Sequence, residues 1–173
     1  MRIIIEIKAA SAQPQIAEQI LLEHGAFLHG IDHQIDTYLN VPTGRLKIRE
    51  GNVENNLIYY NRTEEAGKLK ESHVDLIPIN DSNKNFVALI KKMLTQKVVV
   101  DKLRKIFFID NVKFHIDEVQ TLGNFIEIEA ISETGDIPKQ QLTEQCEYYM
   151  KLLGISKVDF INKSYSDLIL LTK

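Results

Sequence analysis

The chain has 173 residues and a net charge of -3; hydrophobic residues make up 44% of it and charged residues 26%. This composition predicts one globular domain over residues 1–173 and excludes a disordered or collagen-like chain. The single cysteine, Cys146, excludes an internal disulfide framework and a cysteine-based zinc site. The near balance of 21 basic and 24 acidic residues argues against a protein that binds nucleic acid through bulk charge.

The N-terminal segment predicts neither a signal peptide nor a membrane helix. Its apolar run before Glu6 covers only residues 3–5, whereas a signal peptide needs about 7–15 apolar residues. A membrane helix needs roughly 18 apolar residues, and no stretch of the chain approaches that length. We therefore expect a cytoplasmic protein without a membrane partner.

The first half of the chain predicts a strand, a helix and then several strands. Residues 2–8 alternate apolar and polar side chains, which is typical of a strand. A helix over about 13–24 follows, with Ser11 as its N-cap. Further extended segments are expected at 35–40, 45–50, 57–62 and 73–77, with a polar loop over 63–72.

A second helix and a group of strands come next. The helix is capped by Asp81 or Ser82 and carries apolar side chains at helical spacing: Phe86, Leu89, Ile90, Met93 and Leu94. Strands are expected at 98–109, 112–119 and 125–131. Asp110 and Asn111 both tolerate left-handed dihedral angles, which favours a tight hairpin between the first two of these strands.

The last quarter of the chain predicts two helices. Pro138 opens a third helix, on which Cys146 lies within an apolar stripe and is expected to be buried. Residues 164–167 resemble a capping box for a short last helix. Mostly antiparallel strands with a few helices indicate an α+β or mainly-β fold.

Charge is distributed unusually on the predicted strands. Side chains two residues apart share a face of a strand, and on several strands that face is charged while the opposite face is apolar. The charged sets are Arg45, Lys47 and Arg49; Lys102 and Arg104; Lys113, His115 and Asp117; Glu127 and Glu129; and Glu6 and Lys8. Basic residues are thus segregated on some strands and acidic residues on others.

Two interpretations fit this pattern. An antiparallel sheet commonly exposes one face to water, but three cations on one strand face would repel each other there. Alternatively, the charged faces turn inward and line a water-filled tunnel or cleft. Clustered Arg and Lys in such a cavity suit a phosphate chain, and carboxylates suit a divalent cation. The second interpretation indicates a metal-dependent enzyme acting on a phosphorylated compound.

Short segments spread along the chain also carry a family resemblance. They are Ile5–Lys8, Asp36–Tyr38, Gly44–Glu50, Leu57–Arg62, Asp101–Arg104, Phe114–Val119, Leu122–Glu129 and Ser164–Leu168. In this order they resemble the CYTH family, which includes class IV adenylate cyclases, thiamine triphosphatases and inorganic triphosphatases. The resemblance covers nearly the whole chain. It implies an α+β, mainly antiparallel fold: an eight-stranded, open-ended barrel called a triphosphate tunnel, with flanking helices.

The resemblance also implies roles for single residues. Phosphate-binding side chains would be Lys8, Arg45, Lys47, Arg49, Arg62, Lys102, Arg104 and Lys113. Ligands of Mg²⁺ or Mn²⁺ would be Glu6, Asp117, Glu127 and Glu129. Tyr38 and Tyr165 would be wall or lid residues.

Two positions depart from the family pattern. The family's N-terminal motif is Glu-x-Glu-x-Lys, but its first Glu is Ile4 here, and isoleucine cannot bind a metal. Arg62 stands near where a lysine is often found. Arginine is a poor general base because it stays protonated. A catalytic base would therefore be Lys8 or Lys102 with a lowered pKa.

The resemblance leaves three functions open. The motifs are most similar to the class IV adenylate cyclase-like group, in which the ribose 3′-oxygen of ATP attacks the α-phosphorus and yields cyclic AMP and pyrophosphate. A triphosphatase would instead direct water at the terminal phosphorus of thiamine triphosphate or inorganic tripolyphosphate. The Ile4 departure also fits a module that binds phosphorylated ligands with little turnover. The expected partner is a nucleoside triphosphate or another triphosphate, and the protein is expected to be a monomer or a homodimer.

Overall fold

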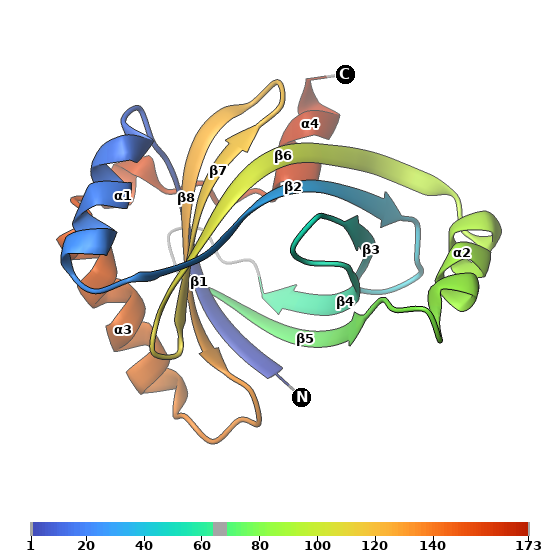
Figure 1. Ribbon diagram of the computed structural model, residues 1–173, viewed down its shortest axis with the longest axis horizontal. Coiled ribbons are helices and arrows are strands. Elements are labelled where there is room, and N and C mark those ends of the chain that lie inside the picture. The colour runs from blue at the N-terminus through green and yellow to red at the C-terminus, as the bar shows by residue number, and fades with distance from the viewer. Residues whose placement is uncertain (1, 64–68, 173) are drawn as a thin grey trace.

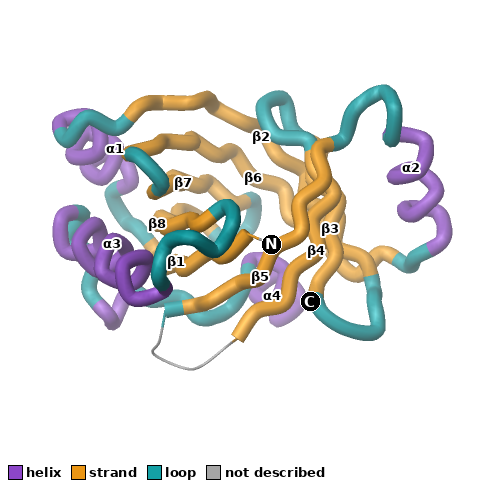
Figure 2. The backbone as a smooth tube through the Cα atoms, turned by 90° about the horizontal axis from the view of Figure 1, so that it is seen from below, coloured by secondary structure: helices purple, strands orange, loops and turns teal. Residues whose placement is uncertain are grey.

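The computed structural model describes residues 2–63 and 69–172. Eight strands of these residues form a closed barrel in the order β1-β5-β4-β3-β2-β6-β7-β8, and neighbouring strands are antiparallel (Figures 1 and 2). The strands are β1 (Arg2–Ala10), β2 (Phe27–Leu39), β3 (Arg45–Glu50), β4 (Asn56–Thr63), β5 (Lys70–Pro78), β6 (Gln96–Ile109), β7 (Val112–Val119) and β8 (Gly123–Ser132). The described helices are α1 (Pro14–Glu23), α2 (Lys84–Met93), α3 (Lys139–Leu152) and α4 (Tyr165–Leu171), with a 3-10 turn at Lys157–Asp159. The predicted fold class, an antiparallel eight-stranded barrel with flanking helices, is confirmed.

Two strands are longer than predicted, for one physical reason. β2 begins at Phe27 rather than near residue 35, and β5 begins at Lys70, inside the predicted loop 63–72. Both added segments bury polar side chains. In β2 Asp32 is fully buried while Ile31 is 48% exposed, and in β5 Lys70 and Ser72 are buried. The alternation of buried apolar and exposed polar side chains, by which a strand is usually predicted, is therefore absent from these segments. Residues 64–68 of the predicted loop lie outside the described residues.

The helix starts were predicted with mixed success. α1 is preceded by Gln13 in the N-cap position rather than Ser11, and α2 by Asn83 rather than Asp81 or Ser82. For α4 the predicted capping box is confirmed: the backbone N–H of Asp167 donates to Ser164 Oγ at 3.2 Å.

The predicted apolar stripe of α2 is only partly buried. Of its five residues, Ile90 and Leu94 are half-buried, and the buried residue of α2 is Val87, which the predicted stripe did not include. Val87 packs against the β2, β3 and β4 side chains Leu39, Ile48 and Leu57. In contrast, Phe86 is 62% exposed and Met93 71% exposed. Helical spacing was correct, but the face that meets the barrel is rotated away from these two residues.

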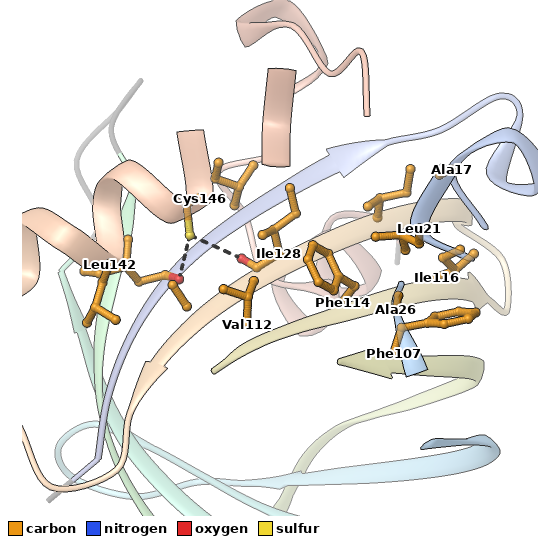
Figure 3. Packing of buried hydrophobic residues seen from close by; sticks show 14 residues of the cluster. Ala17, Leu21, Ala26, Phe107, Val112, Phe114, Ile116, Ile128, Leu142 and Cys146 are labelled. Carbon is orange, nitrogen blue, oxygen red and sulfur yellow. Dashed lines mark hydrogen bonds between the residues drawn. The ribbon is translucent and has the colours of Figure 1, made fainter. Parts of the chain in front are cut away.

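The main hydrophobic core lies outside the barrel, between its wall and helices α1 and α3 (Figure 3). β1 shows how this arises, because Ile5 and Ile7 point outward to the helices while Glu6 and Lys8 point inward. Cys146 of α3 is buried in this core, as predicted, with its Sγ 3.2 Å from the Ile5 carbonyl oxygen. Burial raises the pKa of the Cys146 thiol to about 12, so it is held in the unreactive protonated form.

Helix α4 lies at one end of the barrel. Its Tyr165 packs with Phe125 of β8 and Val98 of β6 in a second apolar cluster. Arg45, at the start of β3, contacts Asp167 of α4 at 2.9 Å. The β3–β4 connection therefore lies at the opposite end of the barrel from α4. In the part of the chain that the structure describes, no helix is long and apolar enough to cross a membrane.

Candidate active site

The barrel encloses a cavity of about 280 Å³. The structure confirms that the charged strand faces turn inward, since most of the predicted charged residues line this cavity. Those lining it are Glu6, Lys8, Lys47, Arg49, Arg62, Lys102, Arg104, Lys113, Glu127 and Glu129, together with Tyr38 and Tyr165. The functional roles of these residues stay predictions, but the fold brings them together.

Asp36 of β2 is the centre of a basic cluster on three strands. Arg49 of β3 donates to both of its carboxylate oxygens, at 2.8 and 3.0 Å. Lys47 Nζ and Lys102 Nζ donate to Asp36 Oδ2 at 2.9 and 2.8 Å. Burial alone would raise the pKa of Asp36, but Arg49 and then Lys102 outweigh burial and hold that pKa well below its usual range. The cluster therefore keeps a fixed carboxylate beneath three basic side chains that face the cavity.

Arg104 of β6 is held by two carboxylates. Its Nε and Nη2 donate to Asp117 of β7 at 2.6 and 2.5 Å, and Nη2 also donates to Glu127 of β8 at 2.6 Å. The Tyr165 hydroxyl donates to Asp117 Oδ2 at 2.8 Å. Both oxygens of Asp117 are thus engaged by protein donors, which places this residue behind Arg104 rather than in the cavity lining. Helix α4 reaches the site through this tyrosine.

Three strands contribute a second group of ion pairs near α4. Lys8 Nζ lies 3.1 Å from Glu127 Oε1 and 3.9 Å from the centre of the Tyr165 ring. Arg62 of β4 donates to Glu6 Oε2 at 2.7 Å. The Lys8 ammonium is therefore positioned by a carboxylate and an aromatic face.

A divalent cation fits one group of side chains among the described residues. Nδ1 of His115 lies 3.0 Å from Glu127 Oε2 and 3.7 Å from Glu129 Oε1, and one ligand atom from each of these residues falls within 4.8 Å of the others. Glu6 is the neighbour of Glu129 across the β1–β8 ladder. Its buried Oε1 accepts no hydrogen bond from the described residues, although Lys70 Nζ lies 4.0 Å away. Two or three carboxylates around one imidazole suit a divalent metal ion.

Two buried lysines have lowered pKa values. Burial lowers the pKa of Lys102 to about 7, and the neighbouring Arg49 and Arg104 add to this effect while Asp36 opposes it. Burial and then Lys8 lower the pKa of Lys70 to about 8, with Glu6 opposing. Lys102 therefore has the property predicted for a general base near neutral pH.

A different surface lines the cavity on β1, β5 and β4, which are adjacent in the barrel. We call Ile4, Ile58, Val74 and Leu76 the apolar wall; all four line the cavity. The first three pack together in one cluster and are at most 8% exposed. The position where the family motif has its first Glu thus belongs to a continuous aliphatic surface.

Sequence reasoning placed some residues and missed others. Arg45 was predicted to bind phosphate, but its Nη1 donates to Ser164 Oγ of α4 at 2.7 Å, and it is absent from the cavity lining. Asp36 lies in a quoted motif, yet no role was predicted for it. Glu54, between β3 and β4, also lines the cavity; its sequence context carries no strand pattern that could have revealed this. His115 was placed on a charged strand face in the sequence analysis, because it alternates with the apolar Phe114, and it lines the cavity.

Comparison with known proteins identifies the family. The model of the CYTH domain matches residues 2–165. This chain belongs to the CYTH family. A Methanocaldococcus jannaschii protein named "putative adenylate cyclase" is 34% identical to it over 95 residues, which are 53% of this chain and 53% of that relative. The match thus spans about half the length of this relative.

Solved structures share the fold of this CYTH domain. A Pyrococcus horikoshii protein superimposes with a TM-score of 0.81 at 23% identity, over 95% of this chain and 98% of the other. A Vibrio parahaemolyticus protein described as a "putative adenylate cyclase" superimposes with a TM-score of 0.75 at 16% identity, over 96% of this chain and 97% of the other. A Hippeastrum protein described as having a dominant triphosphatase activity superimposes with a TM-score of 0.66 at 16% identity, over 99% of this chain and 95% of the other. At these identities the likeness establishes the fold alone.

Proposed function

We propose that this CYTH protein is a divalent-metal-dependent enzyme that binds ATP in the barrel cavity and converts it to cyclic AMP and pyrophosphate. The observation that carries the proposal is the division of the cavity into a charged surface and the apolar wall. A nucleoside triphosphate has the same two parts, a polyanionic chain and an organic group. The relative from Methanocaldococcus jannaschii supports the same reaction through its name.

The charged surface would bind the triphosphate. Lys47 and Arg49 of β3 and Arg104 of β6 present donors from the two strands that flank β2, and their buried carboxylate partners fix the side-chain positions. Charge-assisted hydrogen bonds of this kind are roughly twice as strong as neutral ones. Mg²⁺ or Mn²⁺ held by Glu127 and Glu129, with Glu6 beside them, would neutralise negative charge on the phosphate oxygens.

Lys102 is the residue we assign as general base. It is 2% exposed, lines the cavity, and has a pKa of about 7, so the neutral amine is well populated at physiological pH. In the cyclase reaction it would accept the proton of the ribose 3′-hydroxyl as the 3′-oxygen attacks the α-phosphorus. Lys8, which contacts Glu127, would bind phosphate oxygens close to the carboxylates.

Hydrolysis of a triphosphate is the second candidate function, and Lys102 is the observation that favours it. A buried neutral amine can take a proton from water as well as from a hydroxyl, and this chemistry needs only the charged surface. A triphosphatase would release orthophosphate and would act on tripolyphosphate, which has no organic group for the apolar wall.

Product analysis tests the proposal. Purified protein is incubated with ATP, thiamine triphosphate or tripolyphosphate in the presence of Mg²⁺ or Mn²⁺, and the products are separated. Cyclic AMP with equimolar pyrophosphate is the expected result. Orthophosphate without cyclic AMP would replace the cyclase assignment with a triphosphatase. Tight triphosphate binding without any product would contradict both reactions and favour a binding module.

A further inference from the structure

Glu54 has an unusual place among the acidic side chains of the cavity. Of the described carboxylates that line it, those of Glu6, Asp36, Glu127 and Glu129 come from strands, whereas Glu54 comes from the connection between β3 and β4. Figure 1 shows this connection between the ribbons of β2 and β4. The Glu54 side chain is 17% exposed. A loop therefore delivers one negative charge into a cavity rich in cations.

The Glu54 carboxylate binds two predicted phosphate ligands at once. Its Oε2 accepts from Arg49 Nη1 at 2.8 Å and from Gln34 Nε2 at 3.1 Å, and its Oε1 accepts from Lys113 Nζ at 2.5 Å. Burial would raise its pKa, but Lys113 and Arg49 lower it far below the usual range, so the group is ionised. This carboxylate thus occupies the place that a phosphate oxygen would take between the same two cations.

The contact with Lys113 crosses the barrel. In the ring of eight strands, β7 stands four places from β4, which makes the two strands opposite each other. Lys113 lies near the start of β7, and the far end of that strand, Val119, packs with Tyr165 of α4. The Glu54–Lys113 ion pair therefore spans the cavity near the end that lies away from α4.

The loop is built to hold Glu54 in this position. Asp32 of β2 accepts the backbone N–H groups of Val53 and Glu54 at 2.9 and 3.0 Å. Asn52 Nδ2 donates to the Ile31 carbonyl oxygen at 3.0 Å. A Cβ atom at Gly51 would lie 2.6 Å from Asp32 Oδ1, so the chain approaches β2 too closely for a side chain there. These bonds make the placement of Glu54 a specific feature of the fold.

We propose that Glu54 is an internal competitor for the substrate phosphates and sets the minimum charge that an anion needs to bind. This inference rests on the proposed binding of a triphosphate in the cavity. Any anion that uses Arg49 and Lys113 must displace the Glu54 carboxylate, and each anion loses affinity by the same factor. A triphosphate compensates through further contacts with Lys47 and Arg104, whereas orthophosphate has too few contacts to do so. The same competition weakens retention of a pyrophosphate product.

Anion binding in metal-free buffer with EDTA tests this inference. Dissociation constants for orthophosphate, pyrophosphate and tripolyphosphate are measured by calorimetry for the natural chain, Glu54→Gln and Glu50→Gln. The Glu50 control removes the same charge from a neighbouring residue that is exposed and paired with Lys91 outside the cavity. We expect Glu54→Gln to tighten the binding of orthophosphate, pyrophosphate and tripolyphosphate by a similar factor, about tenfold or more, the scale of a charge-assisted hydrogen bond. Glu50→Gln should change none of the three affinities by more than about twofold.

The outcomes separate this inference from the proposed function. If the natural chain binds tripolyphosphate and Glu54→Gln binds it equally well or more weakly, Glu54 is not a competitor, while triphosphate binding still stands. If the natural chain and Glu54→Gln both fail to bind any of the anions, in EDTA and again with Mg²⁺ in excess, the proposed function itself is contradicted. Glu54→Asp provides a second variant that keeps the charge but withdraws the carboxylate by one methylene. Glu54→Asp should give a smaller gain in anion affinity than Glu54→Gln. If neither variant binds the anions more tightly than the natural chain, the inference is overturned.

Discussion

The charged surface and the apolar wall of the cavity are built by the same antiparallel barrel but differ in what holds them. On the charged surface each cation is fixed by a carboxylate, as Arg49 is by Asp36 and Arg104 by Asp117. On the apolar wall Ile4, Ile58 and Val74 pack directly on one another. The difference teaches that one alternation rule can produce a preorganised anion site and an aliphatic surface within a single cavity. The predictions below test whether the two surfaces act on different parts of one substrate.

The largest effect is expected on the charged surface from Glu127→Gln. This change removes a carboxylate that faces His115, Lys8 and Arg104 together. Turnover should fall about 10²–10³-fold, the scale for loss of a positioned electrostatic group in an active site. Calorimetric titration with Mn²⁺ should show weaker metal binding. Glu118→Gln, an exposed change on the same barrel wall, serves as the control, and equal turnover in both variants would remove Glu127 from the metal site.

Arg49→Ala should weaken tripolyphosphate and ATP binding to a similar extent. Arg49 belongs to the charged surface, which would bind the phosphate chain that both ligands share. A charge-assisted hydrogen bond is worth about 1.5–3 kcal/mol, which corresponds to roughly 10–150-fold in the dissociation constant. Calorimetry on both ligands measures the effect. Lys91→Ala, whose side chain pairs with Glu50 outside the cavity, should leave both affinities unchanged. A loss for ATP alone would show that the charged surface does not bind the phosphate chain.

The pH dependence should report on Lys102. Its pKa of about 7 lies below that of an ordinary lysine, so the neutral base is lost as the pH falls through 7. We expect kcat/KM to drop about tenfold per pH unit on that acidic side. In Lys102→Arg the side chain stays protonated, and turnover should lack this rise with pH. An unchanged profile in the variant would assign the base to another residue.

The smallest effect should come from the apolar wall. Ile58→Ala removes aliphatic surface beside the organic group, so ATP affinity should fall about three- to tenfold. Tripolyphosphate affinity should stay within about twofold of its value in the natural chain, because it has no such group. Ile77→Ala, a neighbouring aliphatic change on β5 at a side chain that is 50% exposed, provides the control. Equal losses for both ligands in Ile58→Ala would mean that the wall supports the barrel without contacting substrate.

Much of the fold was predictable from the sequence because strands with one charged and one apolar face have a clear period. β1, β3, β7 and β8 were placed in this way. The strands that lacked this contrast were harder to delimit. β2 buries Asp32 and Gln34, so its first half shows polar residues where the pattern expects apolar ones.

The candidate site was predictable only where regular strands carry it. Alternation placed Lys47, Arg49 and Arg104 on inward faces, but it could not reveal Glu54, whose position depends on loop bonds to a distant strand. The apolar wall was equally hidden. β4 has apolar side chains on both faces, with Leu57 packed toward α2 and Ile58 toward the cavity, so periodicity does not distinguish inside from outside.

The aromatic lining of the cavity has a practical consequence. Tyr38, Tyr60 and Tyr165 line it, the chain contains six tyrosines, and there is no tryptophan. Tyr165 lies against the Lys8 ammonium and donates to Asp117, so a ligand that rearranges those charges alters the electric field at its ring. Ultraviolet difference absorption or tyrosine emission can therefore follow ligand binding in the natural chain, and the protein carries its own optical probe.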